Sequence, residues 1–166
     1  MPANNLETVK NKISELLKHM GFEADILERQ EEGRTVLNIR TTDAQLLIGK
    51  QGANLEALQH VVHLMARRDA AFEDLPFALD VDDYKEKRVI YLKELARKAA
   101  HQARTSKRSV ALAPMPSYER RVVHNYLSLF SDLISESMGE EPSRRIVIKN
   151  KAKGKSSDDF EFIENT

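Results

Sequence analysis

Two short stretches of this 166-residue chain carry residue types that suit contacts with an anion. The first is Gly49-Lys50-Gln51-Gly52, in which two glycines flank a cation and an amide. Glycine lets a ligand approach the main chain closely, and a helix that starts just behind it offers free N–H groups. The second stretch contains Arg120 and His124, which share one face if the segment is helical. Guanidinium and imidazole groups both bind phosphate, so both stretches are candidate phosphate contacts.

The glycine turn fits few of the known phosphate motifs. The P-loop string G-x-x-x-x-G-K-[ST] and the dinucleotide fingerprint G-x-G-x-x-G are both absent. What remains is G-x-x-G between two predicted helices, the form of the loop that holds about four nucleotides by their backbone in K-homology (KH) domains. Helix-turn-helix proteins use the same tetrapeptide for steric reasons alone, so the tetrapeptide by itself leaves both interpretations open.

The second stretch also has alternatives. Arg120 could pair with a nearby carboxylate such as Glu136, and His124 could be a structural residue. No nucleophile motif and no distinctive pair of carboxylates accompanies His124, so we expect no catalytic residues. The chain has no cysteine, and His60 and His63 lack the acidic partner of a zinc or di-metal motif. We therefore expect neither a metal site nor a cofactor.

The spacing of apolar residues predicts the elements that carry the first stretch. A helix up to Met20 closes at Gly21, and a helix from Asp43, its expected N-cap, leads to Ile48. A further helix follows Gly52. Strands are predicted over 22–27, 35–40 and 77–81. The predicted order through residue 82 is thus α-β-β-α-(GKQG)-α-β.

A long helix from Asp83 to about Arg104 is predicted to lead into the second half of the chain. Beyond it, the pattern predicts a helix over about 117–130 that carries Arg120 and His124, and strands over 109–112, 133–137 and 145–149. The segment GEEPS, residues 139–143, is a predicted turn, and 151–166 is a predicted mobile tail.

Charge is distributed unevenly along the chain. The total is balanced at 26 basic and 26 acidic residues, but residues 1–84 hold 9 basic and 15 acidic residues, and residues 85–166 hold 17 and 11. The basic half suits a polyanion, although a chance distribution of solvated charge explains the difference equally well. No apolar run approaches the roughly 20 residues that cross a bilayer, and the N-terminus lacks a signal-peptide pattern. We expect a cytoplasmic protein without membrane insertion.

The element order over residues 5–83 resembles the type II KH domain. That resemblance implies an α+β fold with a three-stranded sheet and helices on one face. It also implies that Gly49, Lys50, Gln51 and Gly52 clamp a nucleic-acid backbone. Ile48, Leu55 and Leu58 would line the groove or the core beneath it, and for the two leucines we favour the core. Gln59, His63 and Arg67 would form either a polar rim that faces nucleic acid or solvated surface.

The strings LAPMPSYERRVVH and GEEPSRRIVI resemble the Arg-x-x-x-His domain, written R-3-H, a small α+β module that binds single-stranded nucleic acid. The resemblance assigns nucleic-acid contacts to Arg120 and His124. Pro142, Arg144 and Arg145 fall where that family places a turn and a basic strand, so Arg144 or Arg145 is expected to add a backbone contact.

A KH domain followed by an R-3-H domain, with the string DVDDYKEKR between them, closely resembles the bacterial Jag family of RNA-binding proteins. The resemblance implies a KH domain over 1–83, a joining helix and R-3-H domain over 84–150, and the tail. The N-terminal Jag domain and charged linker of many members are not in this sequence. Ser137-Met138-Gly139 also departs from the Ser-Glu-Gly that often precedes the Glu-Pro turn.

The same resemblance implies a function in post-transcriptional regulation or cell elongation. The expected partner is single-stranded RNA, which is favoured over DNA. A KH-mediated homodimer or heterodimer is a further expectation. The alternative function is that of a protein-interaction adaptor at the ribosome or at the membrane-insertion machinery.

Overall fold

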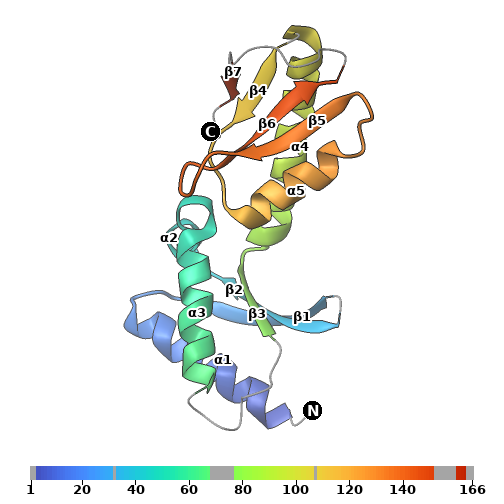
Figure 1. Ribbon diagram of the computed structural model, residues 1–166. Helices are drawn as coiled ribbons and strands as arrows, with labels where there is room; N and C mark the ends of the chain where they lie inside the picture. The colour runs from blue at the N-terminus through green and yellow to red at the C-terminus, as the bar shows by residue number, and fades with distance from the viewer. Residues whose placement is uncertain (1–2, 32, 68–76, 107, 152–159, 164–166) are drawn as a thin grey trace. The chain divides into compact units, whose positions relative to one another are not determined.

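The computed structural model describes residues 3–31, 33–67, 77–106, 108–151 and 160–163. The chain divides into two compact units, Met1–Lys85 and Glu86–Thr166, and each unit is described by itself. Figure 1 shows the elements of both units. In the parts of the chain that the structure describes, none of the helices combines the length and the apolar character that crossing a bilayer requires.

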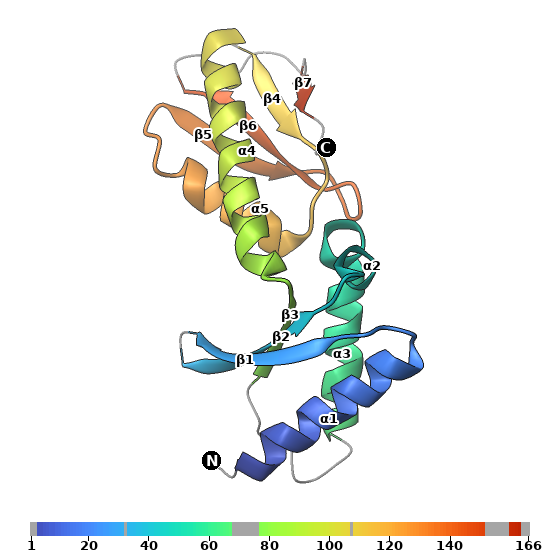
Figure 2. The same ribbon diagram turned by 180° about the vertical axis from the view of Figure 1, so that it is seen from behind.

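The first unit contains a three-stranded sheet and the helices that cover it (Figures 1 and 2). The sheet order is β1-β2-β3, with β1 and β2 antiparallel and β2 and β3 parallel. In chain order the elements are α1 (Ala3–His19), β1 (Asp25–Glu31), β2 (Arg34–Arg40), α2 (Ala44–Ile48), the 3-10 turn η1 (Lys50–Gly52), α3 (Ala53–Arg67) and β3 (Phe77–Val81).

Helices cover one face of this sheet because alternate strand residues are apolar. Leu37 and Ile39 of β2 and Leu79 and Val81 of β3 are fully buried, and they share one core with apolar residues of all three helices. The intervening residues carry polar side chains such as Asn38 and Asp80 to the opposite face. The core therefore holds α2 and α3 against the sheet and so positions the turn between them.

The second unit packs α4 and α5 against a four-stranded sheet of order β5-β6-β4-β7. The buried face of α4 is rich in alanine, and Ala96, Ala99 and Ala103 share one core with Val110 and Ile148 of the sheet. The elements are α4 (Tyr84–Ser106), which begins in the last residues of the first unit, β4 (Ser109–Leu112), α5 (Ser117–Leu127), β5 (Leu133–Met138), β6 (Arg145–Asn150) and β7 (Phe160–Ile163).

The predicted α+β class and the α-β-β-α-α-β order of the first unit are confirmed. The first strand begins at Asp25 rather than Phe22, because Phe22 follows the Gly21 turn and packs against the core. Asp43 precedes α2 but makes no side-chain capping bond. The segment expected to be a mobile tail contains β7, which pairs in parallel with β4 and brings Ile163 onto the core. The remainder of that predicted tail, 152–159 and 164–166, lies outside the described residues.

Candidate nucleic-acid interface

The GKQG turn has a main-chain geometry that requires glycine. Gly49 ends α2 with φ 69° and ψ −176°. Residues with a Cβ atom avoid this region of main-chain conformation, so it is essentially restricted to glycine. Gln51 lies in the left-handed region at φ 54° and ψ 28°, and Gly52 follows at φ 84°. The N–H of Gly52 donates to the carbonyl oxygen of Gly49 at 3.3 Å. The chain therefore reverses within four residues, directly in front of α3.

Two neighbouring side chains occupy the space in which a Cβ atom would stand. A Cβ on Gly49 would lie 2.5 Å from Cγ of Asn54, and one on Gly52 would lie 2.8 Å from Cε1 of Tyr84. Asn54 also donates from Nδ2 to the carbonyl oxygen of Leu46 at 2.8 Å, which satisfies one of the last acceptors of α2. Asn54 and Tyr84 thus pack against the two glycines of the turn. A larger residue in place of either glycine would force the turn or the side chain packed against it to move.

Lys50 adds an exposed cation to the start of α3. Within the described residues no carboxylate forms an ion pair with it, so its charge is available to an incoming anion. The first N–H groups of α3 lie in the same segment, and helix starts favour negative charge. Leu55 and Leu58 are buried in the core, as we favoured, and Ile48 packs against that core from the edge.

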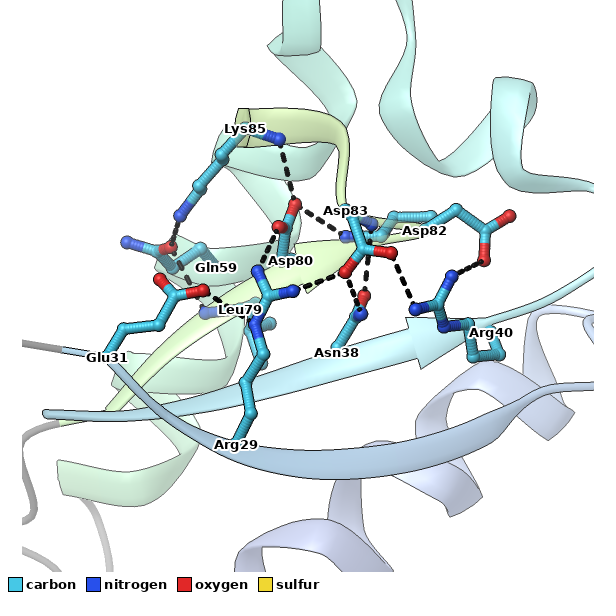
Figure 3. Close-up of polar contacts among 11 residues, drawn as sticks. Arg29, Glu31, Asn38, Arg40, Gln59, Leu79, Asp80, Asp82, Asp83 and Lys85 are labelled. Carbon is cyan, nitrogen blue, oxygen red and sulfur yellow. Dashed lines mark hydrogen bonds and ion pairs between the residues drawn. The ribbon is translucent and has the colours of Figure 1, made fainter. Parts of the chain in front are cut away.

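Gln59 and His63 contact the free edge of β3, and Figure 3 shows the Gln59 contacts. The N–H of Leu79 donates to Oε1 of Gln59 at 3.4 Å, and Nζ of Lys85 donates to the same oxygen at 3.0 Å. Nε2 of His63 lies 3.2 Å from the carbonyl oxygen of Phe77, and the two rings stack with centroids 4.6 Å apart. Gln59 and His63, two of the three residues expected to form a polar rim or solvated surface, therefore cover the edge of β3. The third, Arg67, is exposed.

The face of the sheet opposite the helices carries a polar network that leads into α4 (Figure 3). Arg29 pairs with both Asp80 and Asp83, and Arg40 donates to Asp83 at 2.6 Å. Burial raises the pKa of Asp83, but hydrogen bonds and charges from Arg40 and Arg29 outweigh it and hold that pKa below its usual value. Asp82 and Asp83 both have positive φ, so this network supports the bend between β3 and α4.

Arg120 lies inside the second unit rather than on its surface. Its side chain is 10 % exposed, Nη1 donates to the carbonyl oxygen of Met115 at 2.7 Å, and Nη2 lies 2.8 Å from Oε1 of Glu141. Arg120 therefore pairs with a carboxylate, as the alternative interpretation of the sequence held, but the partner is Glu141 rather than Glu136. Glu136 pairs instead with Lys149 at 2.6 Å.

The three other predicted contact residues of this unit are placed differently from Arg120. His124 and Arg144 are exposed, and Arg145 is half-buried. Nδ1 of His124 lies 2.7 Å from Oγ of Ser135, and Nε of Arg144 donates to Oγ of Ser137 at 3.0 Å. Arg145 donates to the carbonyl oxygen of Ser143, and its guanidinium lies 5.6 Å from the centre of the Phe162 ring.

Sequence reasoning missed the residues that hold the predicted contacts. Ser135 and Ser137 alternate along a predicted strand, which places both hydroxyls on one side, and that spacing was the available signal. No comparable pattern in the sequence indicated the role of Asn54. Its hydrogen bond to Leu46 and its packing beside Gly49 depend on how tightly α2 and α3 pack.

Comparisons with known proteins agree with this architecture. The family model of the R-3-H domain matches residues 91–150. The RNA-binding protein KhpB of Clostridium symbiosum is 32 % identical over 155 residues, which cover 90 % of this chain and 69 % of that protein. KhpB of Lactiplantibacillus plantarum is 35 % identical, and the match covers 80 % of this chain and 41 % of that protein. KhpB of Bacillus subtilis is 37 % identical, and the match covers 74 % of this chain and 60 % of that protein. The chain thus spans less than two thirds of the last two relatives.

The fold and the match define a protein in which a KH-type unit precedes an R-3-H domain. The chain belongs to the KhpB family, and the resemblance to the Jag family is thereby confirmed.

Proposed function

We propose that this protein binds single-stranded RNA by its sugar–phosphate backbone, with one contact region in each unit. The GKQG turn supplies the first region, and His124, Arg144 and Arg145 supply the second. The observation that carries the proposal is the turn itself, where the glycine main-chain geometry, an exposed Lys50 and the start of α3 coincide. The name of the relatives, RNA-binding protein, supports the same function.

Binding rather than catalysis is the activity we propose. Among the described residues no three histidine, aspartate or glutamate side chains are grouped so that they could hold a metal ion. Two linked contact regions raise the apparent affinity through effective concentration, provided that one strand reaches both. We place this activity in the cytoplasm and assign it to post-transcriptional regulation.

The proposal is tested by replacing Lys50 and Gln51 with Asp. Affinity for a labelled RNA oligonucleotide, measured across salt concentrations, should fall. The salt slope should flatten by about 0.7 for each phosphate that the protein no longer neutralises. The matched control replaces Lys18 and Ser14 with Asp, which makes the same change of net charge on the exposed surface of α1. Equal binding by the two folded variants would contradict the proposed role of the turn.

A second candidate function is self-association or association with another KH unit, and one observation favours it. Val61 and Leu64 of α3 are 44 % and 48 % exposed, one turn apart on the helix. Replacing both with Glu should convert any dimer to monomer in sedimentation velocity without changing the fold. Identical sedimentation of both proteins as monomers would exclude this candidate.

A further inference from the structure

Strand β5 presents two serine hydroxyls that each contact a cationic side chain. Ser135 contacts His124 and Ser137 contacts Arg144, at 2.7 Å and 3.0 Å. Residues two apart on a strand point to the same side and are separated by about 6.6 Å. The four side chains therefore form two cation–hydroxyl pairs in a row, at a spacing that suits successive phosphates of an extended strand.

The hydroxyl of Ser135 can keep a proton on Nε2 of His124 in both charge states of the ring. A serine hydroxyl both donates and accepts. When it donates to Nδ1 of the neutral ring, the single N–H of that ring is on Nε2. When the ring is protonated, the hydroxyl accepts from Nδ1, and Nε2 again carries an N–H. Nε2 is thus left as a hydrogen-bond donor, the role that a phosphate oxygen requires.

The contact between Ser137 and Arg144 restricts an exposed side chain. An exposed arginine loses rotamer entropy when it is immobilised on an anion, and this loss weakens binding. Because Nε of Arg144 donates to Ser137, the guanidinium is already partly ordered. Among the described residues neither of its two terminal nitrogens has a hydrogen-bond or ion-pair partner, so both can meet a ligand. The only residue between the two serines, Glu136, points to the other face of the strand and pairs with Lys149.

We infer that His124, Ser135, Ser137 and Arg144 together form a site for the phosphodiester backbone of a single strand, in which the two serines are positioning residues. Arg120 is not a contact of this site, because its side chain is buried and occupied by Met115 and Glu141. This inference rests on the proposed function of the second unit. It replaces the Arg120/His124 pair with a site that runs along β5.

The test measures binding of a fluorescent oligouridine to the full chain at several salt concentrations. Replacing Ser135 or Ser137 with Ala should weaken binding by about 2- to 10-fold each, with an unchanged salt slope because no charge is removed. Replacing His124 and Arg144 with Ala should weaken binding and flatten the slope. Thr at either serine position should restore affinity. The control is Ser128→Ala, which removes an exposed hydroxyl that donates to the carbonyl oxygen of Asn125.

Two further measurements separate positioning from a general structural role. The ring ¹⁵N signals of His124 should shift in Ser135→Ala and return in Ser135→Thr. Arg144→Lys keeps the charge but loses the Nε donor, so its effect and that of Ser137→Ala should be strongly non-additive. If Ser135→Ala folds poorly, this double-mutant cycle tests the site without it, and if Ser137→Ala folds poorly, the His124 signals in the Ser135 variants do.

The outcomes distinguish the inference from the function on which it rests. If both serine variants bind as the unmodified protein does while Arg144→Ala weakens binding, the serine site is refuted and RNA binding by this unit stands. If neither these changes nor those at Lys50 and Gln51 affect binding, the proposed function itself is refuted. Equal competition by polyglutamate and by RNA would overturn the assignment of the site to phosphate.

Discussion

Arg120 and Glu141 form an ion pair in which Nη2 lies 2.8 Å from Oε1, and the arginine side chain is buried while the glutamate is 60 % exposed. The same guanidinium binds the carbonyl oxygen of Met115, which precedes α5. The arginine of the Arg-x-x-x-His spacing thus ties the start of α5 to the Glu-Pro turn, and the histidine one turn later faces the surface. The two residues of this pair therefore have different roles.

Arg120→Ala should therefore act mainly on stability. It leaves the buried carbonyl of Met115 without its donor, so the free energy of unfolding of the second unit should fall by about 1–3 kcal/mol. RNA affinity of the folded protein should change less than in His124→Ala. Thermal unfolding and RNA titration of the same samples measure both, with the exposed Arg121→Ala as the control. A large loss of affinity at unchanged stability would show that Arg120 contacts RNA directly.

Gly49→Ala should damage the turn and its binding together. The main-chain conformation at Gly49 costs a residue with a side chain about 1–3 kcal/mol, and the new Cβ would overlap Asn54. We expect lower stability of the first unit and weaker RNA binding. Gly33→Ala is the matched control, because Gly33 also has positive φ but nothing lies within 4 Å of the new Cβ. That control should lose some stability and retain its affinity.

Glu119→Ala should be strongly destabilising. Glu119 is 4 % exposed and accepts from Nε and Nη2 of Arg88 at 2.7 Å and 3.0 Å. The substitution removes the buried carboxylate that accepts both bonds from the half-buried Arg88, and loss of one partner of a buried pair costs about 3–5 kcal/mol. Glu136→Ala, which removes the exposed partner of Lys149, should cost about 0–1 kcal/mol. Chemical unfolding followed on the second unit would compare the two, and equal losses would contradict the distinction.

The Asp83 network predicts a loss of stability in acid. Because the pKa of Asp83 is lower in the folded protein than in the unfolded chain, its contribution is complete above the unfolded value near 4. That contribution disappears as the pH falls through the lowered folded pKa. Asp83→Asn should remove this part of the pH dependence, whereas Asp25→Asn, on the exposed start of β1, should leave it. Hydrogen exchange of β2 and β3 amides between pH 3 and pH 7 would report it.

Gln59→Ala should alter the base preference of the first unit more than its salt dependence. Gln59 contacts the edge of β3 and carries no charge, and base contacts rather than phosphate contacts specify sequence. Affinities for different homopolymers should change relative to one another while the salt slope stays constant. His60→Ala, on the exposed side of the same helix, should change neither quantity. A uniform loss across all homopolymers would assign Gln59 a purely structural role.

Apolar periodicity was sufficient to predict most of the fold. Leu37 and Ile39 alternate with the polar Asn38 between them, and Leu55, Leu58 and Val62 repeat at helical spacing, so their burial follows from local geometry. β7 was missed because Phe160–Ile163 is a short strand in a polar segment, and it is held there by pairing with β4. No local pattern reports a pairing partner that lies elsewhere in the chain.

The sequence by itself determined the glycine turn, because Gly49 and Gly52 have positive φ angles that glycine adopts without steric cost. It also determined that Arg120 and His124 share a helical face. Only the tertiary structure decided that this face divides into a buried end at Met115 and Glu141 and an exposed end beside Ser135. Spacing along a helix fixes which residues are neighbours, whereas the segments packed against that helix decide whether a cation reaches water or a carboxylate.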